Sequence, residues 1–183
     1  MNQEKLLLEI KRRLEKLRLP FFLSCGTLLG AVRSGGFIDK DLDLGIMGSW
    51  RQEKQKIIDA LTFDGLCKSK EYLFYKKQPV ILGFVSEQYT VDIGFHYLEA
   101  GKIWKGINAG YLVVEEFNTK HFDAWNVIDF CGTKFIIPSY VEELLKHKYG
   151  EDWRVPDLHW HWQKLKSITK HIKNKDVERE VYA

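Results

Sequence analysis

The seven-residue segment that starts at Asp41, Asp-Leu-Asp-Leu-Gly-Ile-Met, places the strongest constraint on how this chain can fold. Its acidic or small residues alternate with apolar ones, and a period of two is typical of a β-strand with one buried face. Leu42, Leu44 and Ile46 would then face a core, while Asp41 and Asp43 would share the opposite face. The sequence therefore predicts a strand that carries two neighbouring carboxylates.

Other segments predict helices and short strands that pack with this strand. An amphipathic pattern that stops at Pro20 predicts an N-terminal helix, and a Ser-x-x-Glu capping box at Ser139 predicts another. The expected helices are 3–18, 28–33, one that begins at Ser49, and 139–148, and the expected strands are 21–24, 41–47, 72–75, 80–85, 89–97 and 111–114. This order predicts an α+β fold, with a small mixed β-sheet flanked by helices.

Composition narrows the class of protein. With 45% hydrophobic and 14% aromatic residues, the chain is neither disordered nor collagen-like, and it shows no internal repeat. A chain of 183 residues is long enough to bury one core, so we expect a single domain over 1–183.

The cysteines and the apolar runs bear on the cellular compartment of the protein and on whether it spans a membrane. Cys25, Cys67 and Cys131 are far apart and contain no C-x-x-C pair, which argues against a disulfide framework or a cysteine-based zinc site. No apolar run approaches the roughly 20 residues that a membrane span needs. We therefore expect a cytoplasmic protein without a membrane span.

The excess positive charge lies at the C-terminus. The formal net charge is +3, and residues 164–183 contain six Lys or Arg and three Asp or Glu. The remainder is balanced, which argues against a broad basic face for nucleic acid. We expect the residues of this segment to form a basic helical tail or a loose end.

Residue types suited to phosphate and metal chemistry occur at a defined spacing. Gly26 and Thr27 stand where a strand turns into a helix, and thirteen residues separate them from Asp41 and Asp43. Free N–H groups at a helix start bind phosphate oxygens, and paired carboxylates suit Mg²⁺ or Mn²⁺. Asp92 lies on the polar face of a later strand and would complete the acidic site.

Several of these features have a second interpretation. A single D-x-D is also common at solvated strand ends, and Asp39 is either an extra ligand or a turn residue. Arg33 is either a phosphate ligand or a cation at a helix C-terminus. His96 is either a proton shuttle or a hydrogen-bonded structural residue, and the segment 159–162 either binds a ligand or packs in the core.

Two longer motifs resemble a known family. Residues 22–46 read FLSCGTLLGAVRSGGFIDKDLDLGI, and residues 137–156 read IPSYVEELLKHKYGEDWRVP. The first resembles the Gly-Thr and Asp-x-Asp region of the LicD family, which includes the fukutin-related phosphoribitol transferases, within the nucleotidyltransferase superfamily. The second is similar to the C-terminal Tyr-Gly-x-x-Trp signature of that family.

This resemblance spans about 20–156 and implies that these residues form the catalytic core of a nucleotidyltransferase-like fold with a C-terminal helical cap. It also implies a reaction. The reaction is metal-dependent transfer of a phosphocholine or phosphopolyol group from a CDP-linked donor to a sugar or glycan hydroxyl. The family roles fall on Asp41, Asp43 and Asp92 for metal binding and catalysis, and on Gly26, Thr27 and Arg33 for substrate binding. Relatives often have Pro-Trp where Ile38 is followed directly by Asp39, a difference that concerns acceptor recognition.

Two alternatives remain open from the sequence. The first is a minimal nucleotidyltransferase that moves a nucleoside monophosphate from a nucleoside triphosphate to a small molecule, RNA or protein. The second is a catalytically silent nucleotide-binding module that keeps the fold.

Overall fold

A computed structural model of the chain describes residues 1–62, 68–75, 77–86, 88–172 and 177–181. Four α-helices and three short 3₁₀ segments occur in this part of the chain. The helices are α1 (Gln3–Lys16), α2 (Cys25–Ser34), α3 (Lys54–Leu61) and α4 (Val141–Tyr149), and the 3₁₀ segments are η1 (Gly48–Glu53), η2 (Thr119–Phe122) and η3 (Trp162–Lys164). The strands are β1 (Phe22–Leu23), β2 (Asp41–Met47), β3 (Lys68–Tyr75), β4 (Gln78–Val85), β5 (Thr90–Glu99), β6 (Lys102–Asn108), β7 (Leu112–Asn118), β8 (Trp125–Phe130), β9 (Thr133–Pro138), β10 (Ile168–Ile172) and β11 (Val177–Val181).

Within the described residues, nine strands form one sheet and β8 and β9 form a separate hairpin. The main path of the sheet is β10-β7-β6-β5-β4-β3-β11, and β2 joins it by pairing with β5. The β2–β5 pair is parallel, whereas the other pairs are antiparallel. The predicted mixed sheet is confirmed, although it is larger than the sequence suggested.

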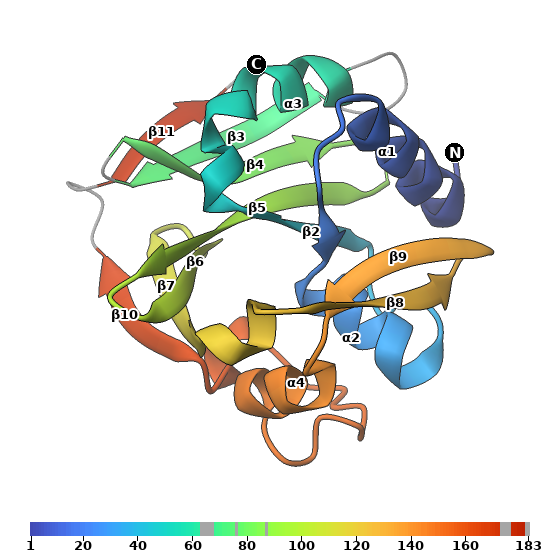
Figure 1. Cartoon of the computed structure of the whole chain (residues 1–183), viewed down its shortest axis with the longest axis vertical. Coiled ribbons are helices and arrows are strands. Elements are labelled where there is room, and N and C mark those ends of the chain that lie inside the picture. Colours follow the sequence, from blue (N-terminus) through green and yellow to red (C-terminus); the bar gives the residue numbers. More distant parts are fainter. Residues whose placement is uncertain (63–67, 76, 87, 173–176, 182–183) are drawn as a thin grey trace.

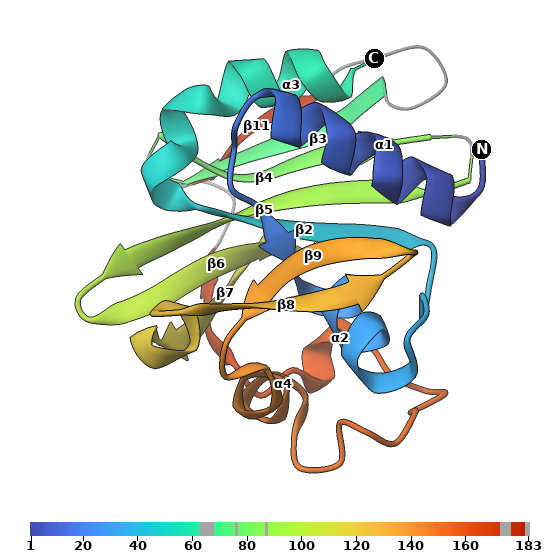
Figure 2. The same ribbon diagram turned by 45° about the vertical axis from the view of Figure 1, so that its right-hand side comes forward.

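Helices and the hairpin cover the two sides of the sheet. Figures 1 and 2 show α1 and α3 together on one side, and α2, α4 and the β8–β9 hairpin on the other. The N-terminal helix is confirmed, and the residues of α1 that are buried lie on one stripe: Leu6, Leu7, Ile10 and Leu14. Nearly all buried apolar side chains of the described residues belong to one core.

Strand β2 has the two faces that its alternation predicts. Leu42, Leu44 and Ile46 are at most 1% exposed, so their face belongs to the core. On the other face the ring of Phe22 lies directly over Gly45, and a Cβ there would stand 2.2 Å from Phe22 Cε2. Glycine is therefore required for this close approach.

The predicted helical tail is wrong. Residues 168–172 form β10, which pairs antiparallel with β7, and residues 177–181 form β11, which pairs antiparallel with β3. Both strands lie at the ends of the sheet path. An edge strand is held by backbone hydrogen bonds on one side, so it needs no continuous apolar pattern, and its polar sequence misled the prediction.

Other differences are local. Helix α4 begins at Val141 with Tyr140 as its N-cap and without a side-chain cap, so the capping box at Ser139 is wrong. The helix expected from Ser49 begins instead as the 3₁₀ segment η1 and becomes α-helical at Lys54. Strands β6, β8 and β9 were not predicted.

The β8–β9 hairpin has a recognisable turn. Cys131 and Gly132 connect the strands with φ values of 51° and 69°, and two consecutive positive φ values are typical of a tight type I′ hairpin turn. The thiols of Cys25 and Cys131 are free, and Cys67 lies outside the described residues. None of the helices that the structure describes is long and apolar enough to span a membrane.

The contact at Gly45 leads to a testable prediction. We expect Gly45→Ala to lower the free energy of unfolding by about 1–3 kcal/mol, because the added methyl group overpacks against Phe22. The matched control is Gly36→Ala, since a Cβ at Gly36 meets nothing within 4 Å. Urea unfolding of both variants measures the difference in their free energies of unfolding. Equal values would contradict the close packing of Phe22 on Gly45.

Candidate active site

The candidate site begins where β1 turns into α2. Ser24 N–H donates to the backbone oxygen of Asp43 at 3.1 Å, and Gly26 N–H donates to Asp43 Oδ2 at 2.9 Å. In return, Asp43 N–H donates to Thr27 Oγ1 at 2.8 Å. These three hydrogen bonds fix the start of α2 against β2, with the Asp43 carboxylate at the helix N-terminus, where a negative charge is favoured.

The two predicted phosphate-binding residues therefore have partners within the chain. Gly26 N–H binds the Asp43 carboxylate, and Thr27 is 2% exposed with its hydroxyl on the backbone of β2. Phosphate binding by Gly26 and Thr27 stays a prediction.

A second carboxylate approaches Asp43 above Gly26. A Cβ placed on Gly26 would lie 3.2 Å from Asp39 Oδ2 and 3.2 Å from Asp43 Oδ2, so the two oxygens converge over a residue without a side chain. Asp39 Oδ1 also accepts a hydrogen bond from Asp41 N–H at 3.0 Å, as a turn aspartate does. The geometry supports the turn role of Asp39 and places its carboxylate near that of Asp43, whereas its role as an extra ligand stays a prediction.

The three predicted carboxylates lie on one face of the sheet. In the parallel pair of β2 and β5, Asp43 stands opposite Asp92 and Asp41 opposite Thr90, and residues in register share a face. Asp41 is exposed, while Asp43 and Asp92 are partly buried. Across the part of the chain that the structure describes, no three His, Cys, Asp or Glu residues are grouped closely enough to hold a metal ion. The three-carboxylate metal site stays a prediction.

The electrostatics of Asp43 fit a cation. Burial raises the pKa of Asp43 to about 6, the ammonium group of Lys105 opposes this shift, and the charge of Asp39 adds to it. Neighbouring carboxylates that repel each other bind a cation favourably, and oxygen donors are the ligands that Mg²⁺ and Mn²⁺ prefer. The carboxylate oxygens of Asp39 and Asp43 near Gly26 are therefore suitable ligands for these ions.

Behind Asp43 lies a buried group of charges that the sequence analysis missed. We call Lys105, Glu115, Lys148 and Ser167 the buried charge cluster. Glu115 is 0% exposed, and its carboxylate accepts hydrogen bonds from Lys148 Nζ at 2.5 and 2.7 Å and from Ser167 Oγ at 2.5 Å. Lys105 Nζ is 3.5 Å from Glu115 Oε2. Isolated charges in β6 and β7 gave no sequence signal, because a charged residue on a strand usually faces solvent.

The electrostatics of the cluster favour the charged forms of Glu115 and Lys105. The two lysines hold the pKa of Glu115 at about 2 against the effect of burial. Burial disfavours the charge of Lys105, but Cys25 and Glu115 raise the pKa of Lys105 above its usual value. A cluster with two ammonium groups and one carboxylate thus stands beside the acidic face.

The C-terminal motif, residues 137–156, contacts α2. Arg33 Nη1, near the end of α2, donates to Trp153 O at 3.5 Å, so the motif and α2 are in contact. Burial raises the pKa of Tyr149 well above its usual value, with further effects from Cys25 and Asp43. The ring of Trp160 lies 5.9 Å from that of Tyr149. Phosphate binding by Arg33 stays a prediction.

His96 has the environment of a structural residue. Its side chain is 2% exposed, Nδ1 lies 3.2 Å from Gly94 O, and the rings of Phe22 and Phe122 are 4.9 and 5.4 Å away. Burial and the charge of Lys105 lower the pKa of His96 to about 3. His96 is therefore neutral at physiological pH, which favours the structural interpretation over a proton shuttle.

The model of the LicD/FKTN/FKRP nucleotidyltransferase domain matches residues 18–140. The chain belongs to this family. The match includes α2, β2 and β5. It confirms the resemblance of the first motif, residues 22–46, and the nucleotidyltransferase-like fold class, whereas the Tyr-Gly-x-x-Trp signature lies beyond the matched residues.

Curated relatives share the region of the site. The ribitol-5-phosphate transferases FKTN of Macaca fascicularis and Homo sapiens are each 29% identical over 172 residues, which cover 89% of this chain and 35% of those proteins. The enzyme of that name from Mus musculus is 30% identical over 161 residues, which cover 83% of this chain and 33% of that protein. The chain spans about a third of the length of these relatives.

Solved structures share the fold. A crystal structure of ANT(2″)-Ia in complex with adenylyl-2″-tobramycin has a TM-score of 0.51 at 16% identity. The aligned residues cover 89% of this chain and 83% of the ANT(2″)-Ia chain. The solution structure of ANT(2″)-Ia has a TM-score of 0.50 at 18% identity, with 90% and 80% covered. At this identity the likeness concerns the fold alone.

The environment of His96 predicts a pH effect on stability. Because the unfolded chain takes up a proton near pH 6.5 and the folded chain only near pH 3, His96 makes acid destabilising between these values, by up to about 1.4 kcal/mol per pH unit. We expect His96→Phe to reduce the slope of unfolding free energy against pH between pH 6 and 4. Urea unfolding at several pH values measures the slope. The control is His159→Phe, which changes an exposed histidine, and its slope should equal that of the unmodified protein.

Proposed function

We propose that this chain transfers a substituted phosphate, with ribitol phosphate as the first candidate, from a CDP-linked donor to a hydroxyl group of a sugar or glycan. The observation that carries the proposal is the convergence of the Asp39 and Asp43 carboxylates over Gly26. Membership of the LicD/FKTN/FKRP family supports phosphate-group transfer, and the names of the relatives suggest ribitol 5-phosphate as the transferred group.

The acidic face would hold a divalent cation. Asp43 would be its principal ligand, with Asp39 above Gly26 and with Asp41 and Asp92 on the same face of the sheet. When bound, Mg²⁺ or Mn²⁺ supplies positive charge that offsets the phosphate oxygens of the donor.

The residues of the chain then position the reactants. The acceptor hydroxyl attacks the phosphorus that carries the polyol, the bond from this phosphorus to the bridging oxygen breaks, and CMP leaves with that oxygen. Asp92, beside Asp43 in the parallel register, accepts the proton of the hydroxyl group as a general base. Most of the rate enhancement comes from positioning and charge neutralisation, because phosphoryl transfer needs little covalent help from the protein.

The reaction class is tested by phosphorus NMR with CDP-ribitol, a glycan acceptor and Mg²⁺. We expect the diphosphate signals to decline as CMP and a new phosphodiester signal appear, and chelation of the metal should stop the reaction. A parallel panel of nucleoside triphosphates should yield no pyrophosphate. Pyrophosphate release would instead indicate a nucleotidyltransferase, and no consumption of any donor would indicate a silent binding module.

Asp43→Asn tests the site itself. We expect turnover to fall by about 100-fold or more, since the variant loses a negative charge that the cation needs. Folding should persist within about 1 kcal/mol, because asparagine keeps an oxygen acceptor for Gly26 N–H. The control is Asp129→Asn, which changes an exposed residue paired with Lys134 on the β8–β9 hairpin. Full turnover of Asp43→Asn would contradict the assignment.

A further inference from the structure

The buried charge cluster holds more positive than negative charge. Lys105 is 6% exposed, Lys148 is 5% exposed, and Glu115 is completely buried. The Glu115 carboxylate accepts hydrogen bonds from Lys148 Nζ and Ser167 Oγ at 2.5–2.7 Å. Lys105 Nζ is farther away, at 3.5 Å from Glu115 Oε2. A buried ammonium group is costly unless an anion offsets it, so Lys105 is the cation that Glu115 satisfies least.

The ammonium group of Lys105 is directed toward the start of α2. Its Nζ lies 2.6 Å from Cys25 Sγ, and Lys148 Nζ lies 3.5 Å from the same sulfur atom. Cys25 is the first residue of α2, and the N–H group of the next residue binds Asp43. Two cations therefore converge on the first residue of α2.

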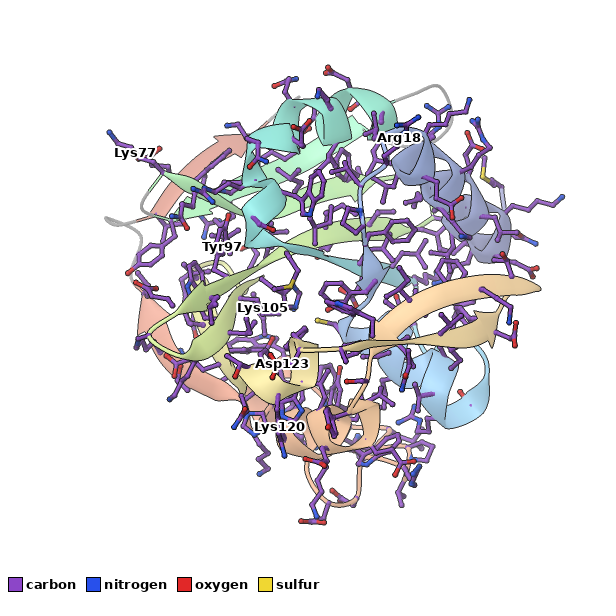
Figure 3. All side chains as sticks on the ribbon, viewed as in Figure 1. Arg18, Lys77, Tyr97, Lys105, Lys120 and Asp123 are labelled. Carbon is purple, nitrogen blue, oxygen red and sulfur yellow. The ribbon has the colours of Figure 1, made fainter. Side chains whose placement is uncertain are left out.

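The Lys105 side chain passes beside Gly94 in β5. A Cβ on Gly94 would lie 3.7 Å from Lys105 Cε, an ordinary contact distance, so the lysine lies against this face of β5. Gly94 follows Asp92 by two positions and shares its face. Figure 3 shows Lys105 inside the molecule, between β5 and the side where α4 lies.

The cluster also borders a small cavity of about 20 Å³. Lys105, Lys148 and Cys25 line a pocket whose other walls are mainly apolar and include Phe22 and Leu144. A charged group next to apolar walls acts in a low dielectric, where it attracts an anion more strongly than it does in water.

From these contacts we propose that Lys105, supported by Glu115 and Lys148, is a phosphate-binding residue that receives the diphosphate of the nucleotide donor at the N-terminus of α2. This inference rests on the proposed function and extends it, because it assigns the donor diphosphate to a defined cation. The acidic pair and Lys105 would then flank the diphosphate from two sides, one through a bound cation and one directly.

Lys105 also suits the charge that develops during the reaction. When CMP leaves, the departing oxygen gains negative charge, and an ammonium group already directed at that position stabilises it without rearrangement. Glu115 keeps the lysines in place, since its carboxylate contacts both ammonium groups. Glu115 is thus a positioning residue, whereas Lys105 contacts the donor.

Lys105→Met tests the inference, because methionine keeps the length of the side chain and removes its charge. Titration calorimetry in the presence of Mg²⁺ would measure the binding of CDP and of inorganic pyrophosphate to the whole chain. We expect both dissociation constants to rise at least tenfold. The matched control is Lys102→Met, which removes an exposed lysine of the same strand that pairs with Glu116 at 3.0 Å, and its dissociation constants should stay within twofold.

Folding of the variants is checked separately. Lys105→Met leaves Glu115 with Lys148 and Ser167, so we expect a native circular dichroism spectrum. Lys105→Gln provides a second variant that keeps a hydrogen-bond donor, and it should show the same loss of binding.

The possible outcomes separate the two proposals. If the unmodified chain binds CDP and pyrophosphate through Lys105 but does not consume CDP-ribitol, the inference stands and the proposed function fails. If the unmodified chain transfers ribitol phosphate, and the Lys105 variants bind and react equally well, the inference is overturned and the function stands. Failure of the unmodified chain to bind either probe would also overturn the inference.

Discussion

The arrangement of the site depends on the hydrogen bonds that join Asp43 to the first turn of α2. Ser24 and Gly26 donate to Asp43, and Asp43 donates to Thr27, so helix and strand cannot shift independently. Strand β2 is in turn held in parallel register with β5. The position of Asp92 relative to Asp43 follows from that register, and the acidic face is built into the backbone of the sheet.

Opposite charges both lie near this turn. The carboxylates of Asp39 and Asp43 approach Gly26, and the buried ammonium groups of Lys105 and Lys148 contact Glu115 and Cys25. The pKa of Asp43 is raised by Asp39 and lowered by Lys105. A diphosphate entering here would meet groups that are already ordered, which is the main requirement for electrostatic stabilisation.

The sequence predicted local features better than distant contacts. The alternation in β2 identified the face of Asp41 and Asp43, because side-chain direction in a strand depends only on position. The pairing of β2 with β5 joins residues almost fifty positions apart, and no local pattern encodes it. Lys105 and Glu115 were missed for the same reason: their charges balance each other only after β6 and β7 pair. The family motifs supplied the site residues that periodicity alone could not assign.

The last two strands give the C-terminal segment a structural task. β10 and β11 occupy opposite ends of the main sheet path, and Ser167, just before β10, binds Glu115. Residues beyond position 140, where the family match ends, therefore complete the sheet and reach the interior of the site. A protein shortened to the matched region would expose backbone groups of β3 and β7 along two open borders and would invite association between chains.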